Sequence, residues 1–199
     1  GGAIPAGRTA DTPITERIKL HALEKDAVAG LARDIISDDC VIFLDTGTTT
    51  LALARRLIGF KKLRLYTNSL RIAQAACEHF GVQVLMTPGH LRPVEQDLVG
   101  YDTIAYIQQF HFDMVFMGAA AVNADYGFMD FEEDEARIRQ VLLKQTSRSV
   151  MLADHSKSGK VGNVITAPFG RVHTLVTERP PPEDIAGALR AEELEIIHG

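Results

Sequence analysis

The residues best suited to chemistry in this sequence follow a short apolar run at positions 41–44. That run, Val41-Ile42-Phe43-Leu44, leads into Asp45-Thr46-Gly47-Thr48-Thr49-Thr50 and then into a segment rich in Leu and Ala. The pattern predicts a buried strand, a turn around one glycine and a helix. Such a turn places backbone N–H groups and threonine hydroxyls at the positive end of a helix, where a phosphate or another small anion is stabilised. The turn therefore indicates a small-molecule site, and alone it says little about what happens there.

Four further polar loops follow apolar runs later in the chain. In an open parallel sheet, ligands bind beyond the carboxyl ends of the strands, so we expect these loops to share a crevice with the first one. A single loop would be weak evidence, because Ser and Thr cap helices everywhere. The four loops are Thr67-Asn68-Ser69, Thr87-Pro88-Gly89-His90-Leu91-Arg92, Gly118-Ala119-Ala120 and Asp154-His155-Ser156-Lys157.

Each candidate residue also has a purely structural interpretation. Threonine and serine could be helix caps, a glycine could serve only a tight turn, and an arginine could be a solvated surface charge. Glu135 and Arg139 lie four residues apart, a spacing typical of an exposed helix ion pair worth roughly 0.3 kcal/mol. The residues for which both interpretations stay open are Thr48, Thr49, Asn68, Ser69, Gly89, Arg92, Glu135, Arg139, Asp154 and Lys157.

A regular alternation of elements must position these loops. Short apolar runs that alternate with helical patterns favour βαβ units, and thus an α/β fold with an open, mostly parallel sheet flanked by helices. We expect loops over 119–131 and 154–162. The predicted strands are 41–44, 63–66, 82–86, 113–117, 149–153, 172–176 and 194–197, and the predicted helices are 24–36, about 49–58, about 69–79, 98–110, 132–145 and 183–190.

Length and charge limit the class of protein. The 199 residues fit one domain, and residues 1–20, rich in Gly, Pro and Thr, resemble an arm or linker before a domain over 21–199. The formal net charge is −5, and no basic stripe appears, so we do not expect this segment itself to grip nucleic acid.

The sequence also bears on cofactors and on localisation. The two cysteines, Cys40 and Cys77, lack metal-ligand spacing, and we expect neither a metal nor a cofactor. There is no apolar run near 18 residues and no secretory signal pattern, so we expect a cytoplasmic protein without membrane contact.

The ordered set of loops resembles the C-terminal effector-sensing domain of the DeoR/GlpR family of bacterial transcriptional regulators. Any one motif is unspecific, but the set in this order is strongly specific, and the resemblance covers nearly the whole chain. The matching segments are Glu16-Arg17 with Glu24-Lys25, Leu44 to Thr49, Thr67 to Leu70, Gly89 to Arg92 with Gly100, Phe112-Asp113 through Gly118, and Asp154 to Lys157.

This resemblance implies a fold similar to ribose-5-phosphate isomerase, glucosamine-6-phosphate deaminase and the CoA-transferase core (the NagB/RpiA-like fold). It also implies a sensor for a phosphorylated sugar or related metabolite in a repressor of a sugar-metabolism operon. This repressor would be a homodimer or homotetramer that contacts operator DNA only through an N-terminal winged helix-turn-helix, and Gly1-Gly2-Ala3 resembles the end of its wing. The implied ligand-binding residues are Asp45, Thr46, Gly47, Thr48, Thr49, Thr67, Asn68, Ser69, Gly89, Arg92, Gly118, Glu135, Asp154 and Lys157.

Four positions depart from the family pattern. Pro88 and Ala121 stand where glycine is frequent, Asn123 where aspartate is frequent, and Arg139 where lysine is common. Arginine keeps the charge but changes reach and hydrogen-bond geometry. We expect these departures to affect ligand preference more than the position of the site.

Three function classes compete on this sequence. A ligand-binding sensor is the preferred hypothesis. A sugar-phosphate isomerase or deaminase on the same scaffold would need a general base beside the phosphate turn, and Gly118-Ala119-Ala120-Ala121-Val122 offers no ionisable group. Asp125, Asp130 or Glu135 could stand in, so the enzyme remains the alternative, with no catalytic residue assigned. A purely structural oligomerisation domain fits the convergent polar loops less well.

Overall fold

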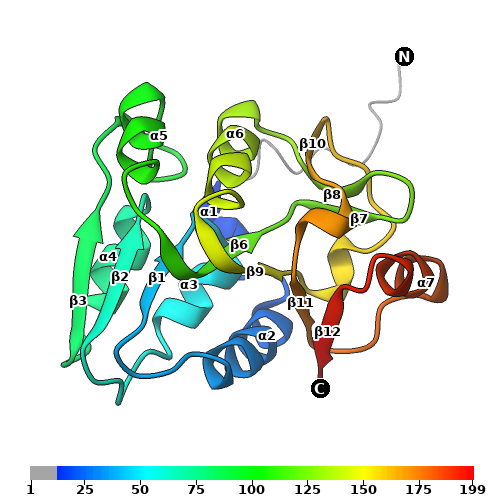
Figure 1. Cartoon of the computed structure of the whole chain (residues 1–199), viewed down its shortest axis with the longest axis horizontal. Helices are drawn as coiled ribbons and strands as arrows, with labels where there is room; N and C mark the ends of the chain where they lie inside the picture. Colours follow the sequence, from blue (N-terminus) through cyan, green and yellow to red (C-terminus); the bar gives the residue numbers. More distant parts are fainter. Residues whose placement is uncertain (1–12) are drawn as a thin grey trace.

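Seven parallel strands form the central sheet of this protein (Figure 1). The structure is a computed structural model that describes residues 13–199. The strand order is β12-β11-β9-β6-β1-β2-β3, so the chain starts in the middle of the sheet and builds outward in both directions. The strands of this sheet are β1 (Val41–Leu44), β2 (Leu63–Thr67), β3 (Val82–Met86), β6 (Phe112–Gly118), β9 (Thr146–Leu152), β11 (Thr174–Thr177) and β12 (Glu195–His198).

Helices cover both faces of the sheet, and each face has its own hydrophobic core. Because side chains alternate along a strand, Phe43 packs into one core while Ile42 and Leu44 pack into the other. The first core includes residues of α5 (Tyr101–Ile107), α6 (Glu133–Leu142) and α7 (Glu183–Ala191). The second includes residues of α2 (Ala22–Asp34), α3 (Thr48–Ala54) and α4 (Leu70–Ala76).

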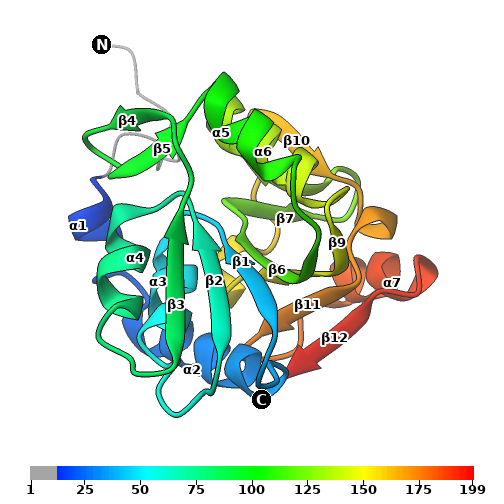
Figure 2. The same cartoon turned by 60° about the vertical axis from the view of Figure 1, so that its left-hand side comes forward.

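Two small antiparallel sheets flank the central one. The first has the order β10-β8-β7, with β7 (Ala121–Asn123), β8 (Gly127–Asp130) and β10 (Val164–Ala167). The second is the hairpin of β4 (His90–Arg92) and β5 (Asp97–Val99), which lies near β3 at one edge of the central sheet (Figure 2). Leu98 N–H donates to the carbonyl of Asn68, so this hairpin is fastened to the loop after β2.

The structure confirms the predicted α/β fold with an open, mostly parallel sheet flanked by helices. Two predictions of elements were wrong. Residues 98–110 are not one helix, because Leu98 and Val99 belong to β5 and the helix α5 begins only after its N-cap residue, Gly100. Residues 119–131 are not a loop, because β7 and β8 form a hairpin there whose partner β10 comes more than 30 residues later.

The segment before α2 also differs from a simple arm. Its described part contains the short helix α1 (Ile14–Arg17), and the side chain of Ile14 is buried. Arg17 forms an ion pair with Glu95, in the turn between β4 and β5. Residues 13–20 therefore pack on the rest of the domain, while 1–12 of the predicted arm lie outside the described residues. Within the described part, no helix is long and apolar enough to cross a membrane.

Candidate functional site

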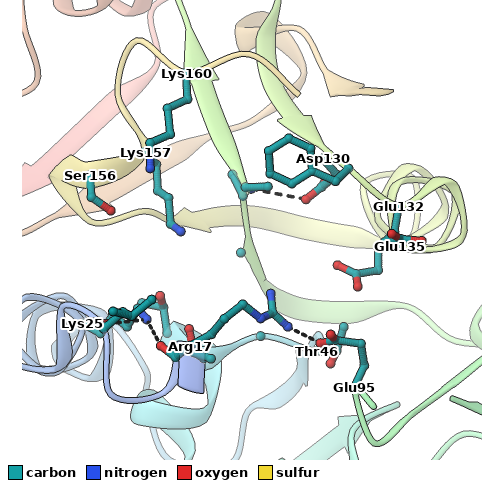
Figure 3. Close-up of a pocket in the computed structure, with 18 of the residues that line it drawn as sticks. Arg17, Lys25, Thr46, Glu95, Asp130, Glu132, Glu135, Ser156, Lys157 and Lys160 are labelled. Carbon is teal, nitrogen blue, oxygen red and sulfur yellow. Dashed lines mark hydrogen bonds and ion pairs between the residues drawn. The ribbon is translucent and has the colours of Figure 1, made fainter. Parts of the chain in front are cut away.

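A polar cavity of about 140 Å³ opens beside the carboxyl ends of β1 and β6. Its walls come from segments that are far apart in the sequence (Figure 3). These are the α1–α2 segment, the β1–α3 turn, the β4–β5 turn, the ends of β6 and β8, the start of α6, and 3-10 helix η2 (His155–Lys157) with the loop after it. The lining residues are Arg17, Leu20, His21, Lys25, Thr46, Gly47, Thr48, Thr49, Glu95, Gly118, Ala119, Ala120, Asp130, Phe131, Glu132, Glu135, Arg139, Ser156, Lys157 and Lys160.

The β1–α3 turn presents the start of a helix to this cavity. Gly47 is the N-cap residue of α3, and no side chain of the described residues caps that helix. Its φ of +154° lies outside the common range of other residues, and an added Cβ would lie 3.0 Å from Thr50 Oγ1. The hydroxyl of Thr46 is buried and has no hydrogen-bond partner among residues 13–199. The turn thus offers uncapped N–H groups and a hydroxyl to a ligand, the features that favour an anion.

One side of the cavity is cationic. Figure 3 shows Lys25, Lys157 and Lys160 gathered on that side. Burial, and after it the nearby charge of Lys157, lower the pKa of Lys25 to about 8. Burial also lowers the pKa of Lys157, where the charges of Lys160 and Arg17 act in the same direction against the opposing pull of Asp154. Cations that repel one another in a partly dry site favour an anionic ligand, whose charge would relieve the repulsion.

The opposite side carries carboxylates held by a buried arginine. Arg139 Nε lies 2.5 Å from Asp45, its Nη1 lies 2.5 Å from Asp130, and its Nη2 lies 3.1 Å from Glu135. Arg92 pairs with Glu135 at 2.8 Å and with Asp97 at 2.6 Å. Glu135 and Asp130 line the cavity, and therefore present oxygens suited to accepting hydrogen bonds from sugar hydroxyls.

Burial and pairing set the charges of this cluster. Burial raises the pKa of Asp45 to about 7, and the charge of Arg139 offsets only part of this effect. Burial also opposes ionisation of Glu135, but Arg139 and Arg92 outweigh it and lower the pKa of that carboxyl. At Arg139 the same carboxylates raise the pKa well above its usual value, against the effect of burial. Glu135 is therefore a carboxylate at neutral pH and Arg139 is a cation.

The structure brings one part of the predicted site residues to the cavity wall. These residues come from the β1–α3 turn, from the end of β6, from α6 and from η2. Their role in ligand binding stays a prediction. They are Thr46, Gly47, Thr48, Thr49, Gly118, Glu135 and Lys157.

The other predicted site residues do not line the cavity, and three of them hold its loops by hydrogen bonds. Asn68 Oδ1 accepts from the N–H of Thr46 at 3.1 Å, and Thr67 Oγ1 donates to the carbonyl of Leu44 at 2.7 Å. Asp154 Oδ1 accepts from the N–H of Ser156 at 3.0 Å. The residues outside the lining are Asp45, Thr67, Asn68, Ser69, Gly89, Arg92 and Asp154.

The predicted list omitted several lining residues. Arg17 and Lys25 were noted in the sequence only as matches to the family at the entry to its first helix. The sequence did indicate that Lys25 is buried, since it shares one helical face with the buried residues Val28, Ala29 and Ala32. The remaining omitted residues are Leu20, His21, Glu95, Ala119, Ala120, Asp130, Phe131, Glu132, Arg139, Ser156 and Lys160.

Of the four departures from the family pattern, only Arg139 lines the cavity. Pro88 accepts a hydrogen bond from Thr103 Oγ1 on its carbonyl, Ala121 is buried in β7, and Asn123 accepts from the N–H of Asp125 in the β7–β8 turn.

Within residues 13–199, no group of three or more His, Cys, Asp or Glu side chains is arranged to hold a metal ion.

The fold is similar to that of solved structures with low sequence identity. A translation initiation factor eIF-2B of Pyrococcus horikoshii OT3 gives a TM-score of 0.60 at 16% identity, over 86% of this chain and 69% of that one. A ribose 5-phosphate isomerase A of Methanocaldococcus jannaschii gives 0.50 at 17% identity, over 69% of this chain and 55% of that one. These matches confirm the predicted similarity to the ribose-5-phosphate isomerase fold, and at such identities they show the fold alone.

Sequence relatives are more informative. The glycerol-3-phosphate regulon repressor of Escherichia coli K12 is 26% identical over 196 residues, which are 98% of this chain and 78% of that protein. A putative aga operon transcriptional repressor of Escherichia coli O157:H7 is 30% identical over 200 residues, 99% of this chain and 74% of that protein. The sequence model of the DeoR C terminal sensor domain matches residues 20–179. The chain therefore belongs to the DeoR family of transcriptional repressors, as its sensor domain.

Proposed function

We propose that this domain binds a phosphorylated sugar, or a related phosphorylated metabolite, and thereby changes the affinity of a DeoR-family repressor for its operator. The observation that carries the proposal is the division of one cavity into a cationic side next to an uncapped helix start and a carboxylate side facing it. A sugar phosphate has the matching division, with an anionic group at one end and hydroxyl donors along the rest.

The lining residues suggest how the ligand is held. The phosphate accepts hydrogen bonds from N–H groups of the Gly47–Thr49 turn and from the hydroxyl of Thr46, and Lys157 supplies the opposite charge. Glu135 and Asp130 accept from sugar hydroxyls. Asn68 and Asp154, which the resemblance implied as ligand-binding residues, instead hold the turn and η2 by hydrogen bonds and do not line the cavity.

Operator contact belongs, in this proposal, to a DNA-binding domain of the whole regulator. The net charge of −5 supports this division, because a surface that binds a duplex normally carries a basic excess. The ligand then acts by having different affinities for the operator-competent and operator-incompetent states. We further propose that the regulator is a homodimer or homotetramer, which light scattering on a size-exclusion column would test.

An isomerase or deaminase is the weaker proposal, because each carboxyl that the sequence offered as a general base at this cavity is either paired with arginine, as Asp130 and Glu135 are, or lies outside the lining. The carboxyl whose pKa lies near 7 belongs to Asp45, which is fully buried and does not line the cavity. Glu135 does line it, but the arginines lower its pKa and make it a poor proton acceptor at neutral pH. Asp125 is exposed and lies outside the lining.

Isothermal calorimetry with a panel of sugar phosphates tests the proposal. We expect at least one member to bind, and its dephosphorylated counterpart to bind at least a hundredfold more weakly, since the phosphate carries the charge-assisted hydrogen bonds. Failure of the whole panel to bind to folded protein would refute the proposal. Turnover of a binding member, abolished by Glu135→Gln, would establish the enzyme instead.

A further inference from the structure

The two edges of the central sheet differ in how they are protected. β12 ends the sheet on one side and β3 on the other, as Figure 2 shows. An edge strand presents unpaired N–H and C=O groups, and proteins usually block it with charged side chains, proline or a bulge. β12 carries the exposed Glu195 and His198. β3 reads Val-Gln-Val-Leu-Met and pairs with β2 in unbroken register, so it has none of these blocks.

Alternate backbone groups of β3 point toward the open edge. The N–H of Thr87, directly after the strand, donates to the carbonyl of Thr67 in β2. Because successive residues of a strand direct their N–H and C=O groups to opposite sides, the odd-numbered residues of β3 face β2 and the even-numbered ones face away from it. Among residues 13–199, no strand pairs with this outer side. The residues whose backbone faces outward are Val82, Val84 and Met86.

The side chains of β3 are apolar but incompletely covered. Val82 and Val84 pack partly against the core that includes α4, and Leu85 packs partly against the core on the other face. Four of the five residues are only half-buried, and Gln83 is exposed. Phe80, two residues before the strand, is 100% exposed. A strand added at this edge would therefore bury apolar side chains as well as pair the backbone.

Charge favours a second copy of this chain as the partner strand. Two copies with a net charge of −5 each repel one another, and an uncharged strand is a place where they can meet without adding to that repulsion. A two-fold axis through Val84 would set Val84 opposite its own copy and Val82 opposite Met86. Apolar side chains would then meet on one face of the joined strands, with Gln83 opposite Leu85 on the other, and no like charges would be opposed.

We infer that two copies of this chain associate through β3, which pairs with itself in antiparallel fashion around Val84. The inference rests on the homo-oligomer in the proposed function, and it names the surface that forms it. The N–H of Val84 donates to the Val84 carbonyl of the second copy, and the N–H of Met86 donates to the carbonyl of Val82. The N–H of Val82 donates within its own chain, to His79. Two central sheets thereby become one continuous sheet.

Sedimentation over a range of protein concentrations tests the inference with edge variants. Val84→Pro removes an N–H that faces outward and leaves the bonds to β2 in place, so we expect the Kd of one association step to rise about tenfold or more. If this variant does not fold, Gln83→Lys gives the same test, because lysine at an exposed position blocks an edge, and about fivefold or more is expected. Gln140→Lys, at an exposed glutamine of α6, is the matched control and should change Kd less than about twofold.

Oxidative cross-linking tests the register, in a chain whose exposed Cys77 is replaced by serine. Val84→Cys should form a disulfide between two copies, because the Cα atoms of such an antiparallel pair lie about 5.5 Å apart, within disulfide range. Val82→Cys is the matched control on the same strand. Its two copies would lie four residues apart along the strands, about 14 Å, and should not cross-link. Equal cross-linking of the two variants, or none in either, would contradict the pairing around Val84.

The outcomes separate this inference from the proposed function. Association that Val84→Pro and Gln83→Lys leave unchanged overturns the inference, and the homo-oligomer then stands with another interface. A wild type that stays monomeric at every concentration overturns both, while calorimetry decides sugar-phosphate binding independently. A monomer in which the amides of Val84 and Met86 exchange slowly would show that another segment of the same chain covers the edge, which also overturns the inference.

Discussion

Arg139 is the residue on which the carboxylate side of the cavity depends. It is 2% exposed and lies against the buried carboxyls of Asp45 and Asp130 and against Glu135, whose side chain is 13% exposed. Replacing a buried pair by apolar groups can be harmless, but removing only one partner leaves the other charges uncompensated. Loss of this one guanidinium therefore affects all three carboxyl groups.

We expect Arg139→Met to lower the free energy of unfolding by about 3–5 kcal/mol at pH 7, since several carboxylates lose their counter-charge. Urea denaturation followed by circular dichroism measures this loss. Arg137→Met on the same helix is the control, because Arg137 is exposed and, among residues 13–199, pairs only with Glu133. This variant should cost under about 1 kcal/mol. Equal losses in the two variants would show that the cluster is not a stabilising unit.

The raised pKa of Asp45 predicts how the free energy of unfolding changes with pH. Its pKa is raised to about 7 in the folded protein, because burial outweighs the attraction of Arg139. At this carboxyl the folded state therefore binds more protons than the unfolded state between about pH 4 and pH 7, so the contribution of Asp45 to stability falls as the pH rises through that window, by at most about 1.4 kcal/mol per unit.

Asp45→Asn replaces the titratable carboxyl by a neutral amide of the same shape. We expect the free energy of unfolding of the wild type to decrease more steeply between pH 5 and pH 7 than that of the variant. Denaturation at four pH values measures both slopes. Parallel slopes would mean that Asp45 is ionised throughout the window.

The phosphate turn makes a prediction about affinity. The double variant Thr48→Val with Lys157→Ala should weaken a phosphorylated ligand by about 2–4 kcal/mol, the sum of one charged and one neutral hydrogen bond. Its melting temperature should hardly change, because both side chains face the cavity and are partly exposed. Lys144→Ala, at an exposed lysine after α6, is the control. A large loss of stability with unchanged affinity would contradict the assignment.

At this scale the sequence identified one side of the cavity better than the other. The Thr46–Thr49 turn and Lys157 follow strands directly, so chain order alone predicts that they meet. Lys25 and Arg17 reach the same space only because α2 packs on α3 and because α1 folds back. Both are features of the tertiary structure that a local sequence pattern does not contain. The role of Arg139 was also hidden, since its spacing from Glu135 suits an exposed pair equally well.

At the scale of elements, the parallel strands were predictable and the antiparallel ones were not. A buried parallel strand reads as a short apolar run, and two of the predicted strands, 41–44 and 82–86, coincide with β1 and β3. β4, β5 and β7 contain only three residues each, too few to show a period. β8 depends on pairing with β10, which lies far along the chain, so no local pattern indicates it.

The β7–β8 hairpin depends on the space at Gly127. Its φ is +78°, and an added Cβ would lie 2.4 Å from the carbonyl oxygen of Ala167 and 2.8 Å from Pro168 Cα, both in the backbone. We expect Gly127→Ala to lower the free energy of unfolding by at least about 2 kcal/mol more than Gly59→Ala. Gly59 is the matched control, because its φ is also positive, at +90°, but nothing lies within 4 Å of the added atom.

Thermal and urea unfolding of the two glycine variants measures this difference. A similar cost at both positions would mean that backbone strain alone, and not the approach of β10, makes Gly127 necessary. Because β8 ends at Asp130, a displaced hairpin should also weaken ligand binding, which Gly59→Ala should leave unchanged.

At the scale of the whole molecule, the cavity belongs to the folded state alone. Its walls combine residues 17–25, 46–49, 118–120, 130–139 and 156–160 with Glu95, and no single stretch of chain carries the phosphate turn together with both charged sides. An unfolded chain therefore has no site, and a ligand stabilises the fold by mass action as RT ln(1 + [L]/Kd). Ligand binding is therefore expected to stabilise the central sheet, the two hairpins and the α1–α2 segment together.

We therefore expect a sugar phosphate that binds in calorimetry to raise the free energy of unfolding by about 2.7 kcal/mol at one hundred times its Kd. Urea titrations with and without the ligand measure the gain, and Kd from calorimetry fixes the value expected. In Lys157→Met the gain at the same concentration should shrink with the weaker Kd, while Lys144→Met should match the wild type, since Lys144 lies outside the lining. A gain far below the value set by Kd would mean that the ligand also binds the unfolded chain, and the site would then not require the assembled walls.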